Sequence, residues 1–449
     1  MEICDRIFTE QPANKCDSDI VQKAIRESGR AYHEYSQLPQ SSRQEIIAGI
    51  KKALAPLVSE IAVMELSETG MGQVQDKIVK LILALEKTPG LEDLEPQVLT
   101  GDDGITLYEY SAYGIVCAVQ PGTNPCATII NNVIGMLAAG NSVIIVPHPR
   151  CVNVSGYTVK HISEAIYKSC GISNLVISMP HTTMQIADEI MGHPDVSMVV
   201  ATGGGKMLGQ ALASKKRVIG AGAANPVAMV DETADLEQAA RNIVDGASFD
   251  HNITCISEKS IVIVSSVADR FIEKLATLGV FFVNDPDEMI SLARATINSS
   301  LIMKRSMEGK SANEILRAAG IACDKDIRLI VVETVKTHPF ATIEMLMPLV
   351  PLIRAKDFDD MLEIALFIEQ GYRHTATIHS QSVTRLNRAA QAMQTSIFVK
   401  NGSSLAALGL NGGSGAGFTI ANITGEGVTT ARNFARRRRC SLMTGLSIR

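Results

Sequence analysis

Hydrophobic residues in the first part of the chain recur every three or four positions, a spacing typical of amphipathic helices with one buried face. The clearest example places Ile46, Ile50 and Leu54 on one side of a helix that begins near residue 41. Pro89-Gly90 then ends the helical pattern. We predict an N-terminal layer of four helices, over residues 17–36, 41–57, 59–69 and 75–87.

Two β-prone stretches follow this layer, at residues 97–100 and 105–110, and they flank Gly101-Asp102-Asp103-Gly104. Glycine accepts positive φ without a steric penalty, so this tetrapeptide suits a tight reversal of the chain. We therefore expect a hairpin over residues 97–110 that projects from the body of the protein.

From residue 114 the apolar residues form short uninterrupted runs, which alternate with stretches of helical spacing. Strands of continuous apolarity between helices are typical of a parallel sheet covered on both faces. We predict two open, doubly wound α/β domains. The expected strands of the first are residues 115–119, 143–146, 175–179, 198–201 and 218–220, and those of the second are 227–230, 261–264, 329–332, 349–354, 375–379 and 396–400. The expected helices are residues 127–138, 154–169, 183–191, 206–213, 236–247, 267–278, 359–370 and 383–393.

The composition fits this interpretation. The chain has 449 residues, is 46% apolar and 20% charged, and carries a net charge of −5, which describes a soluble globular protein of two or three domains. The acidic balance argues against a nucleic-acid partner, and the longest apolar runs are too short to cross a membrane. The four arginines at residues 436–439 could bind an anion, but they are more typical of a solvated edge or a subunit contact.

Nine cysteines are scattered without a CxxC pair, and no secretory signal is recognised. This pattern indicates a reducing cytosol and predicts no metal site. One of them, Cys255, lies in a polar stretch directly before an apolar strand. A loop in that place holds a thiol rigidly yet leaves it reachable, as a catalytic thiolate requires. The alternative is that Cys255 serves only as a small buried hydrophobe.

Three loops are expected at the carboxyl ends of strands in the first domain, where open α/β sheets bind their ligands. They are residues 120–125, 147–150 and 202–206. The last of them, Thr202-Gly203-Gly204-Gly205-Lys206, brings backbone N–H groups to a helix N-terminus and would favour an anion such as a pyrophosphate. It lacks the full GxGxxG or Walker spacing, so an ordinary turn between strand and helix stays an alternative.

The order of these motifs resembles the aldehyde dehydrogenase superfamily along nearly the whole chain. The shared features are Asn124 after the first sheet strand, Thr202-Gly203-Gly204 after the fourth, Cys255 in its loop, and Glu344-Met345-Leu346-Met347-Pro348 in the second domain. A closer resemblance is to the CoA-acylating branch found with bacterial microcompartments, the propionaldehyde and acetaldehyde dehydrogenases of diol and ethanolamine breakdown. It is carried by Asn124-Pro125, residues 135–141, Pro147-His148-Pro149-Arg150, Arg373-His374-Thr375-Ala376, residues 398–402 and the Arg-Arg-Arg-Arg-Cys sequence near the C-terminus.

The resemblance implies an NAD-binding domain over residues 1–224, a catalytic domain over residues 225–420 and a C-terminal oligomerisation segment over residues 421–449. It implies NAD and coenzyme A as cofactors and a small aldehyde as substrate. The hairpin at residues 97–110 and the C-terminal segment are β-prone but have no obvious partner within either α/β domain. We therefore expect them to form a small β oligomerisation element that pairs across the subunits of a homodimer or homotetramer.

The chemistry that the resemblance implies begins with a Cys255 thiolate adding to an aldehyde carbonyl, while the Asn124 side-chain amide and the Cys255 backbone N–H hold the oxyanion. Hydride transfer to the nicotinamide then leaves an acyl-thioester on Cys255. Hydrolytic members open the catalytic domain with a glutamate that activates water, but the corresponding stretch here, Gly220-Ala221-Gly222-Ala223-Ala224-Asn225-Pro226, has no carboxylate. The thioester should therefore await the thiol of coenzyme A.

The resemblance also assigns the cofactor contacts. Glu344 is expected to hold the nicotinamide ribose, and Thr202-Gly203-Gly204 to admit the nicotinamide because these residues are small. His148 stands where most hydrolytic members have a lysine near the adenosine ribose, which leaves the choice between NAD and NADP open. His374 could exchange a proton with the incoming thiol, because an unperturbed imidazole titrates near neutrality. The alternatives are a loop cap for Glu344 and a structural role for His374.

Two other functions stay open, a hydrolytic or phosphorylating NAD(P)-dependent (semi)aldehyde dehydrogenase and a non-catalytic scaffold of the same fold. The missing glutamate argues against water as acceptor, and the presence of Cys255, Asn124 and Glu344 together argues against a scaffold. The expected location is the cytoplasm, with the lumen of a microcompartment and contact with shell proteins left open. Residues 1–15 contain Pro12, so a targeting helix there is expected to be absent or cryptic.

Overall fold

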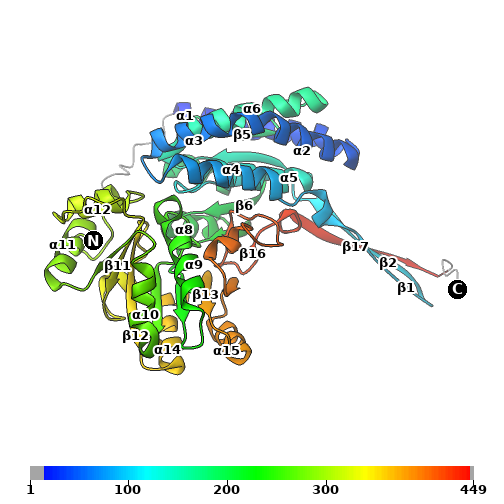
Figure 1. Cartoon of the computed structure of the whole chain (residues 1–449). Helices are drawn as coiled ribbons and strands as arrows, with labels where there is room; N and C mark the ends of the chain where they lie inside the picture. The colour runs from blue at the N-terminus through cyan, green and yellow to red at the C-terminus, as the bar shows by residue number, and fades with distance from the viewer. Residues whose placement is uncertain (1–14, 445–449) are drawn as a thin grey trace. The chain divides into compact units, whose positions relative to one another are not determined.

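The computed structural model describes residues 15–444, and within them the chain forms two compact units (Figure 1). The first unit contains the described residues up to Glu68, then Lys80–Ala221, and then those from Gly415 onward. The second unit contains Thr69–Val79 and Gly222–Ser414. Residues 1–14, which hold most of the segment considered for a targeting helix, lie outside the described part. No helix among the described residues is long and apolar enough to cross a lipid bilayer.

The first unit is built on a five-stranded sheet whose neighbouring strands are all parallel, in the order β5-β4-β3-β6-β7. The chain therefore starts in the middle of the sheet, winds outward through β4 and β5, and returns to add β6 and β7 on the other side. This confirms the predicted doubly wound topology, with its switch point between β3 and β6. The strands are β3 (Ile115–Val119), β4 (Ser142–Val146), β5 (Val176–Ser178), β6 (Val196–Thr202) and β7 (Arg217–Ala221).

Helices cover both faces of this sheet, which explains why all five residues of β3 and of β4 are buried and apolar or small. Side chains of α1, α7 and α8 share one apolar cluster with β3, β4 and β6. The helices α5 and α6 pack against β4 and β5, and α2 packs on α5 and α6. The bounds are α1 (Lys15–Ser36), α2 (Gln40–Leu54), α3 (Val58–Thr69), α4 (Val74–Lys87), α5 (Pro125–Ala138), α6 (Val152–Cys170), α7 (Met184–Gly192) and α8 (Gly205–Ala213).

A three-stranded antiparallel flap belongs to the same unit and consists of β1 (Gln97–Gly101), β2 (Gly104–Ala112) and β17 (Ala435–Met443) (Figure 1). The predicted hairpin is β1 and β2. The hairpin and the C-terminal segment, for which the sequence offered no obvious partner within either α/β domain, pair with each other within the chain. The strand β17 pairs with β2 from Ala435 opposite Ala112 to Met443 opposite Gly104. A further two-stranded ribbon is formed by β15 (Ile420–Ala421) and β16 (Gly427–Val428).

The second unit contains a seven-stranded sheet, again with parallel neighbours, in the order β10-β11-β12-β9-β8-β13-β14. Its central strands β8 and β9 are fully buried. The helices α9 and α10 share an apolar cluster with one face of the sheet, and α14 and α15 share another with β8, β9, β12 and β13. The strands are β8 (Val227–Val230), β9 (Ser260–Val264), β10 (Val280–Val283), β11 (Leu329–Glu333), β12 (Leu349–Ala355), β13 (Thr375–His379) and β14 (Ile397–Lys400).

Four strands and α-helices of the second unit were not predicted, namely β10, α11, α12 and the short α13. The strand β10 lies at the edge of the sheet and is only four residues long, with three of them partly exposed, so its apolar run is short. The helix α11 begins with a usable signal, since Asp285 accepts hydrogen bonds from two backbone N–H groups and Pro286 occupies the first turn. The helices of this unit are α9 (Leu236–Ser248), α10 (Ser265–Leu275), α11 (Pro286–Thr296), α12 (Ala312–Ala318), α13 (Pro339–Thr342), α14 (Phe358–Glu369) and α15 (Val383–Met393).

Candidate active site

Cys255 lies in an irregular loop between the 3₁₀ turn η5 (Phe249–Asn252), which follows α9, and the first residue of β9. Its neighbours Thr254 and Ile256 are buried, whereas Cys255 itself is partly exposed. The thiol is therefore held by a packed loop and remains accessible. The loop position expected from the sequence is the one that the structure has.

The backbone ahead of Cys255 is strained. Asp250, His251 and Asn252 have φ values of 46°, 51° and 61°, in the left-handed region that L residues rarely enter. Asp, His and Asn tolerate this region better than most side chains, but each such residue still raises the energy of the loop by roughly 1 kcal/mol. The surrounding structure must hold three successive left-handed residues in place.

Gln73, which directly precedes α4, and the first turn of α4 hold the first of them. The Asp250 carboxylate accepts a hydrogen bond of 2.7 Å from the backbone N–H of Gln73, and the Asp250 N–H donates to Asp76 at 2.7 Å. The buried ammonium of Lys77 lies 3.4 Å from the same carboxylate. A Cβ at Gly72 would lie 1.9 Å from an Asp250 oxygen, so only glycine allows this close approach.

Hydrogen bonds to carbonyl oxygens hold the other two left-handed residues. The His251 ring nitrogen Nδ1 donates to the Gly309 carbonyl at 2.9 Å. The Asn252 amide donates to the carbonyls of Ala247 and Glu258, at 2.7 and 3.0 Å, and so ties both ends of the loop together.

Lys259 is buried beneath the loop that carries Cys255. Its ammonium donates to the Asn252 carbonyl at 2.5 Å, to the Asn252 side-chain oxygen, and to the Thr254 carbonyl at 3.3 Å. Burial lowers the pKa of Lys259 to about 8, against the attraction of Glu344, Cys255 and Glu258, which raises it. A buried positive charge therefore lies near the candidate nucleophile and attracts its ionised form.

Two carboxyl groups interact with Lys259. Glu258 is fully buried and accepts from the Ser404 hydroxyl at 2.6 Å and from the Ser404 backbone N–H at 2.9 Å, and burial raises its pKa to about 7. Glu344 lies in the loop between α13 and β12, and desolvation raises its pKa to about 7 although part of its surface is exposed. The charge of Lys259 and a hydrogen bond with the Ala224 backbone lower the pKa of Glu344 and so partly offset the effect of desolvation.

His374 is buried directly before β13, where its Nδ1 lies 2.9 Å from the Thr375 hydroxyl oxygen. Burial and the nearby positive charge of Lys259 lower the pKa of His374 to about 3. The premise that this imidazole titrates near neutrality is wrong, because the site disfavours the imidazolium form. His374 is therefore neutral near pH 7, and its predicted exchange of a proton with a thiol stays a prediction.

Three further predicted residues of the first unit follow the carboxyl ends of neighbouring strands. Asn124 comes after β3 and is the N-cap residue of α5, with 8% of its surface exposed. His148 comes after β4, accepts from the Arg150 N–H at 3.2 Å, and lies so close to Gly122 that a Cβ there would meet its ring at 3.1 Å. Since β4, β3 and β6 are adjacent, these residues and Thr202 share one edge of the sheet.

The Thr202-Gly203-Gly204 stretch begins with the last residue of β6 and leads into α8, and open space surrounds its two glycines. The Thr202 hydroxyl lies 2.9 Å from that of Thr419. A Cβ placed on Gly203 or Gly204 would have no atom of the described chain within 4 Å, apart from its chain neighbours. Contacts within the described chain therefore do not require a glycine at either position. The open space beside them is consistent with a binding site for a ligand.

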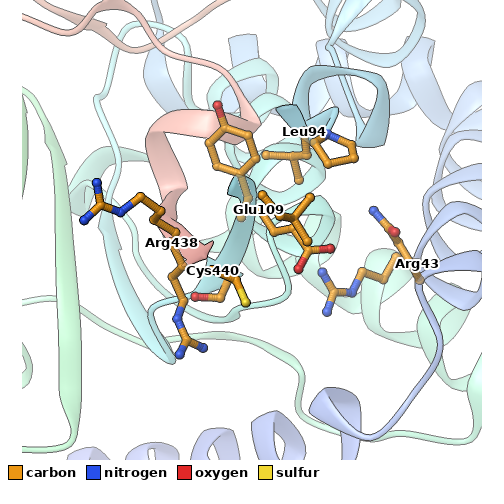
Figure 2. Close-up of a pocket in the computed structure, with 11 residues that line it drawn as sticks. Arg43, Leu94, Glu109, Arg438 and Cys440 are labelled. Atoms are coloured by element: carbon orange, nitrogen blue, oxygen red, sulfur yellow. The ribbon is translucent and has the colours of Figure 1, made fainter. Parts of the chain in front are cut away.

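A cavity of about 450 Å³ lies between α6 and the segment that includes β5, and it is large enough for the adenosine part of a cofactor. Lys160 and Ser163 of α6 offer polar groups there, and Val159 and Met179 offer apolar surface. A second cavity, of about 410 Å³, lies on the flap and is lined by Arg43, Glu109, Arg438 and Cys440 among others (Figure 2). None of the predicted site residues lines this second cavity.

Comparisons with known proteins identify the family of the chain. The model of the aldehyde dehydrogenase family matches residues 9–421. The chain belongs to the aldehyde dehydrogenase family. It is 45% identical over 444 residues to the CoA-propanoylating propanal dehydrogenase of Salmonella typhimurium, covering 98% of this chain and 94% of that protein.

Solved structures of aldehyde dehydrogenases superpose closely on the chain. One is the propionaldehyde dehydrogenase of Rhodopseudomonas palustris with bound CoA and an acylated cysteine, with a TM-score of 0.94, 40% identity and coverage of 96% and 98%. Another is a propionaldehyde dehydrogenase from the fucose utilisation microcompartment of Clostridium phytofermentans, with a TM-score of 0.93, 39% identity and the same coverage. The predicted fold and the resemblance to the CoA-acylating branch of aldehyde dehydrogenases are confirmed.

Sequence reasoning missed three buried lysines of this aldehyde dehydrogenase, and two of them, Lys259 and Lys80, adjoin predicted site residues. Lys259 directly precedes the apolar strand β9, and a charged residue in that position was a usable signal of a functional site. Lys80 is the neighbour of Asn124, since its ammonium donates to the Asn124 side-chain oxygen at 2.5 Å. It sits next to Leu81 on the apolar side of α4, where a lysine is not expected without a partner.

Proposed function

We propose that this chain is a CoA-acylating aldehyde dehydrogenase that oxidises a short-chain aldehyde of the propionaldehyde or acetaldehyde class and reduces NAD. The observation that carries the proposal is Cys255, reachable in a packed loop above the buried ammonium of Lys259. The stretch Gly220 to Pro226, where hydrolytic relatives have their water-activating glutamate, has no carboxylate.

Cys255 acts as the nucleophile in this proposal. The charge of Lys259 favours the thiolate over the thiol, because an opposite charge nearby stabilises the ionised form. The sulfur adds to the aldehyde carbonyl, and the Asn124 side-chain amide donates to the oxygen that becomes negative. Loss of hydride from the adduct carbon to bound NAD then restores the carbonyl as an acyl-thioester on Cys255.

The second half of the reaction transfers the acyl group. The thiolate of coenzyme A attacks the thioester carbon, the bond to the Cys255 sulfur breaks, and acyl-CoA leaves with Cys255 regenerated as a thiolate. His374 is neutral at working pH, so its part is to hold a hydrogen bond rather than to carry a charge. Glu344 and His148 are assigned to the two ribose groups of the dinucleotide, and Thr202-Gly203-Gly204 to the space for the nicotinamide.

We assign the same chain a homodimeric or homotetrameric state in which the flap contacts a second copy. The strands β1 and β17 form the two edges of the flap sheet, and their outer backbone groups are available for pairing. The expected location is the cytoplasm, including the lumen of a microcompartment, since a related structure comes from such a compartment.

One observation favours a second candidate, a hydrolytic aldehyde dehydrogenase. Desolvation raises the pKa of Glu344 to about 7, and Glu344 interacts with Lys259, so it has the properties of a general base that could activate water. The test is NADH formation from propionaldehyde and NAD, with and without coenzyme A, together with identification of the product. Propionyl-CoA and a strict need for coenzyme A support the proposal, whereas propionate at a rate independent of coenzyme A overturns it.

A further inference from the structure

Asn124 occupies a helix N-cap position but does not use its side chain as a cap. Asparagine at this position normally accepts a hydrogen bond from the backbone N–H of the second or third helical residue. In α5, no such bond is made by the side chain of Asn124. The ordinary structural reason for an asparagine at this place is therefore absent, and another partner decides where its amide points.

That partner is Lys80 of α4, whose ammonium donates to the Asn124 side-chain oxygen at 2.5 Å. Both residues are buried, Lys80 with 1% and Asn124 with 8% of its surface exposed. Because an ammonium only donates, it must face the oxygen and not the nitrogen of the amide. The Asn124 NH₂ group is thereby turned to the other side, where it makes a long contact of 3.3 Å with the Thr123 hydroxyl.

We propose that Lys80 is a positioning residue that aims the Asn124 amide N–H groups at the oxyanion of the reaction and strengthens them as donors. The inference rests on the proposed function, since it presupposes that Asn124 holds the oxyanion. A charged hydrogen bond to the amide oxygen draws electron density from the N–H bonds, and the buried charge also attracts the developing negative oxygen. The N-terminus of α5 adds its positive end at the same place.

Another buried lysine of α4 shows that burial alone does not explain this geometry. Lys77 lies near the Asp250 carboxylate, at 3.4 Å, as an ion pair that neutralises its charge. Lys80 makes a shorter bond, and its acceptor is the oxygen of an amide that carries no charge. A charged donor on an amide oxygen fixes the orientation of that amide and polarises its N–H bonds.

Without Lys80 the amide is expected to rotate and cap α5, which turns its N–H groups away from the substrate. Removing an oxyanion donor slows catalysis by about 10²–10³-fold, so Asn124→Ala should fall in that range. The Lys80→Met variant keeps the Asn124 amide, but the amide is no longer oriented by Lys80 and the positive charge beside it is gone. We therefore expect kcat to fall by roughly 10–10²-fold. The KM values for NAD and coenzyme A should change by less than about threefold, since neither is bound by this pair.

The test is a double-mutant cycle of Lys80→Met and Asn124→Ala, with Lys87→Met as the matched control. Lys87 is an exposed lysine in the last turn of the same helix, so its replacement removes the same charge without touching Asn124. We expect Lys80→Met to slow the wild type but to slow Asn124→Ala by no more than about twofold, because the two residues act as one unit. The rate at which iodoacetamide alkylates Cys255 should stay unchanged in both single variants.

The inference is overturned if Lys80→Met lowers kcat by the same factor in the wild type and in Asn124→Ala. It is also overturned if Lys80→Met has the kcat of the wild type. If Asn124→Ala itself keeps full activity, the oxyanion assignment in the proposed function fails instead, which is a different outcome. Should Lys80→Met not fold, Asn124→Asp gives a second readout. A carboxylate facing Lys80 should keep or raise Tm while kcat falls, and a Tm well below that of Asn124→Ala contradicts the proposed orientation.

Discussion

Replacing Lys259 by methionine tests whether the buried ammonium activates Cys255. The side chain of methionine fills most of the same volume but carries no charge. In the wild type the ammonium lies 3.3 Å from the Thr254 carbonyl, one residue before the nucleophile. Two unit charges at a separation of about 6 Å interact by about 3 kcal/mol at an effective dielectric constant of about 20, which corresponds to roughly two pH units.

Cys255 is partly exposed, and solvent reduces this interaction. We therefore expect the midpoint of the pH dependence of iodoacetamide alkylation to move upward by about one to two units in Lys259→Met. At pH 7 the alkylation rate should fall by about 10–10²-fold, because the thiolate is the reactive form. Lys259 also lowers the pKa of Glu344, so the carboxyl of the variant should be more fully protonated at pH 7.

The assay is alkylation with radiolabelled iodoacetamide between pH 5 and 9, with peptide mapping to follow Cys255 alone. Lys356→Met is the control, since Lys356 is exposed in the same unit and its loss removes the same charge. Circular dichroism should show a folded protein, because methionine leaves some loop carbonyls without a donor but also removes a buried charge. A folded Lys259→Met variant with an unchanged alkylation midpoint would refute the reasoning.

The remaining predictions concern the nucleophile, the buried histidine and the flap. Cys255→Ser should lose nearly all dehydrogenase activity at an unchanged Tm, and a variant that keeps more than a few per cent of kcat would show that another group is acylated. The pKa of His374 is lowered to about 3, so its neutral form stabilises the fold above about pH 6.5, and this stability, up to about 5 kcal/mol, is lost as the pH falls toward 3. In urea unfolding, the free energy of unfolding of His374→Asn should fall less steeply than that of the wild type as the pH decreases from 6.5 to 3. The same pH dependence in both proteins would contradict the assignment. Deletion of residues 435–449 removes β17, so sedimentation should show a shift toward monomer, whereas a wild-type monomer at micromolar concentration would contradict assembly through the flap.

The sheets were predictable because both of their faces are covered. Strands such as β3, β4 and β9 are buried along their whole length, and burial on two faces leaves a continuous apolar run that local sequence shows. The edge strand β10 leaves a weaker signal, since it is short and partly exposed. The pairing of β17 with β2 joins segments more than 300 residues apart, and no local pattern encodes such a partner.

The candidate site was predictable only where chemistry is tied to a local motif. Cys255, Asn124 and Glu344 stand in recognisable sequence contexts, whereas the environment that tunes them comes from distant segments. The pKa of His374 depends on burial and on Lys259, which is more than 100 residues away in the chain. Lys80 contacts Asn124 across 44 residues, and only the folded structure shows that the pair exists.

The central claim is that the acyl-enzyme on Cys255 survives water and yields to coenzyme A. The measurement is the amount of NADH formed when the enzyme is mixed rapidly with propionaldehyde and NAD in the absence of coenzyme A. General-base assistance contributes about 10²–10⁴-fold to hydrolysis, so a site without the usual glutamate should stall after the first turnover. The account predicts a burst of at most about one NADH per active site, a propionyl group on Cys255 by mass spectrometry, and steady turnover once coenzyme A is added. Continuous NADH formation far beyond one equivalent, with propionate as product, would contradict it and point to Glu344 as the base.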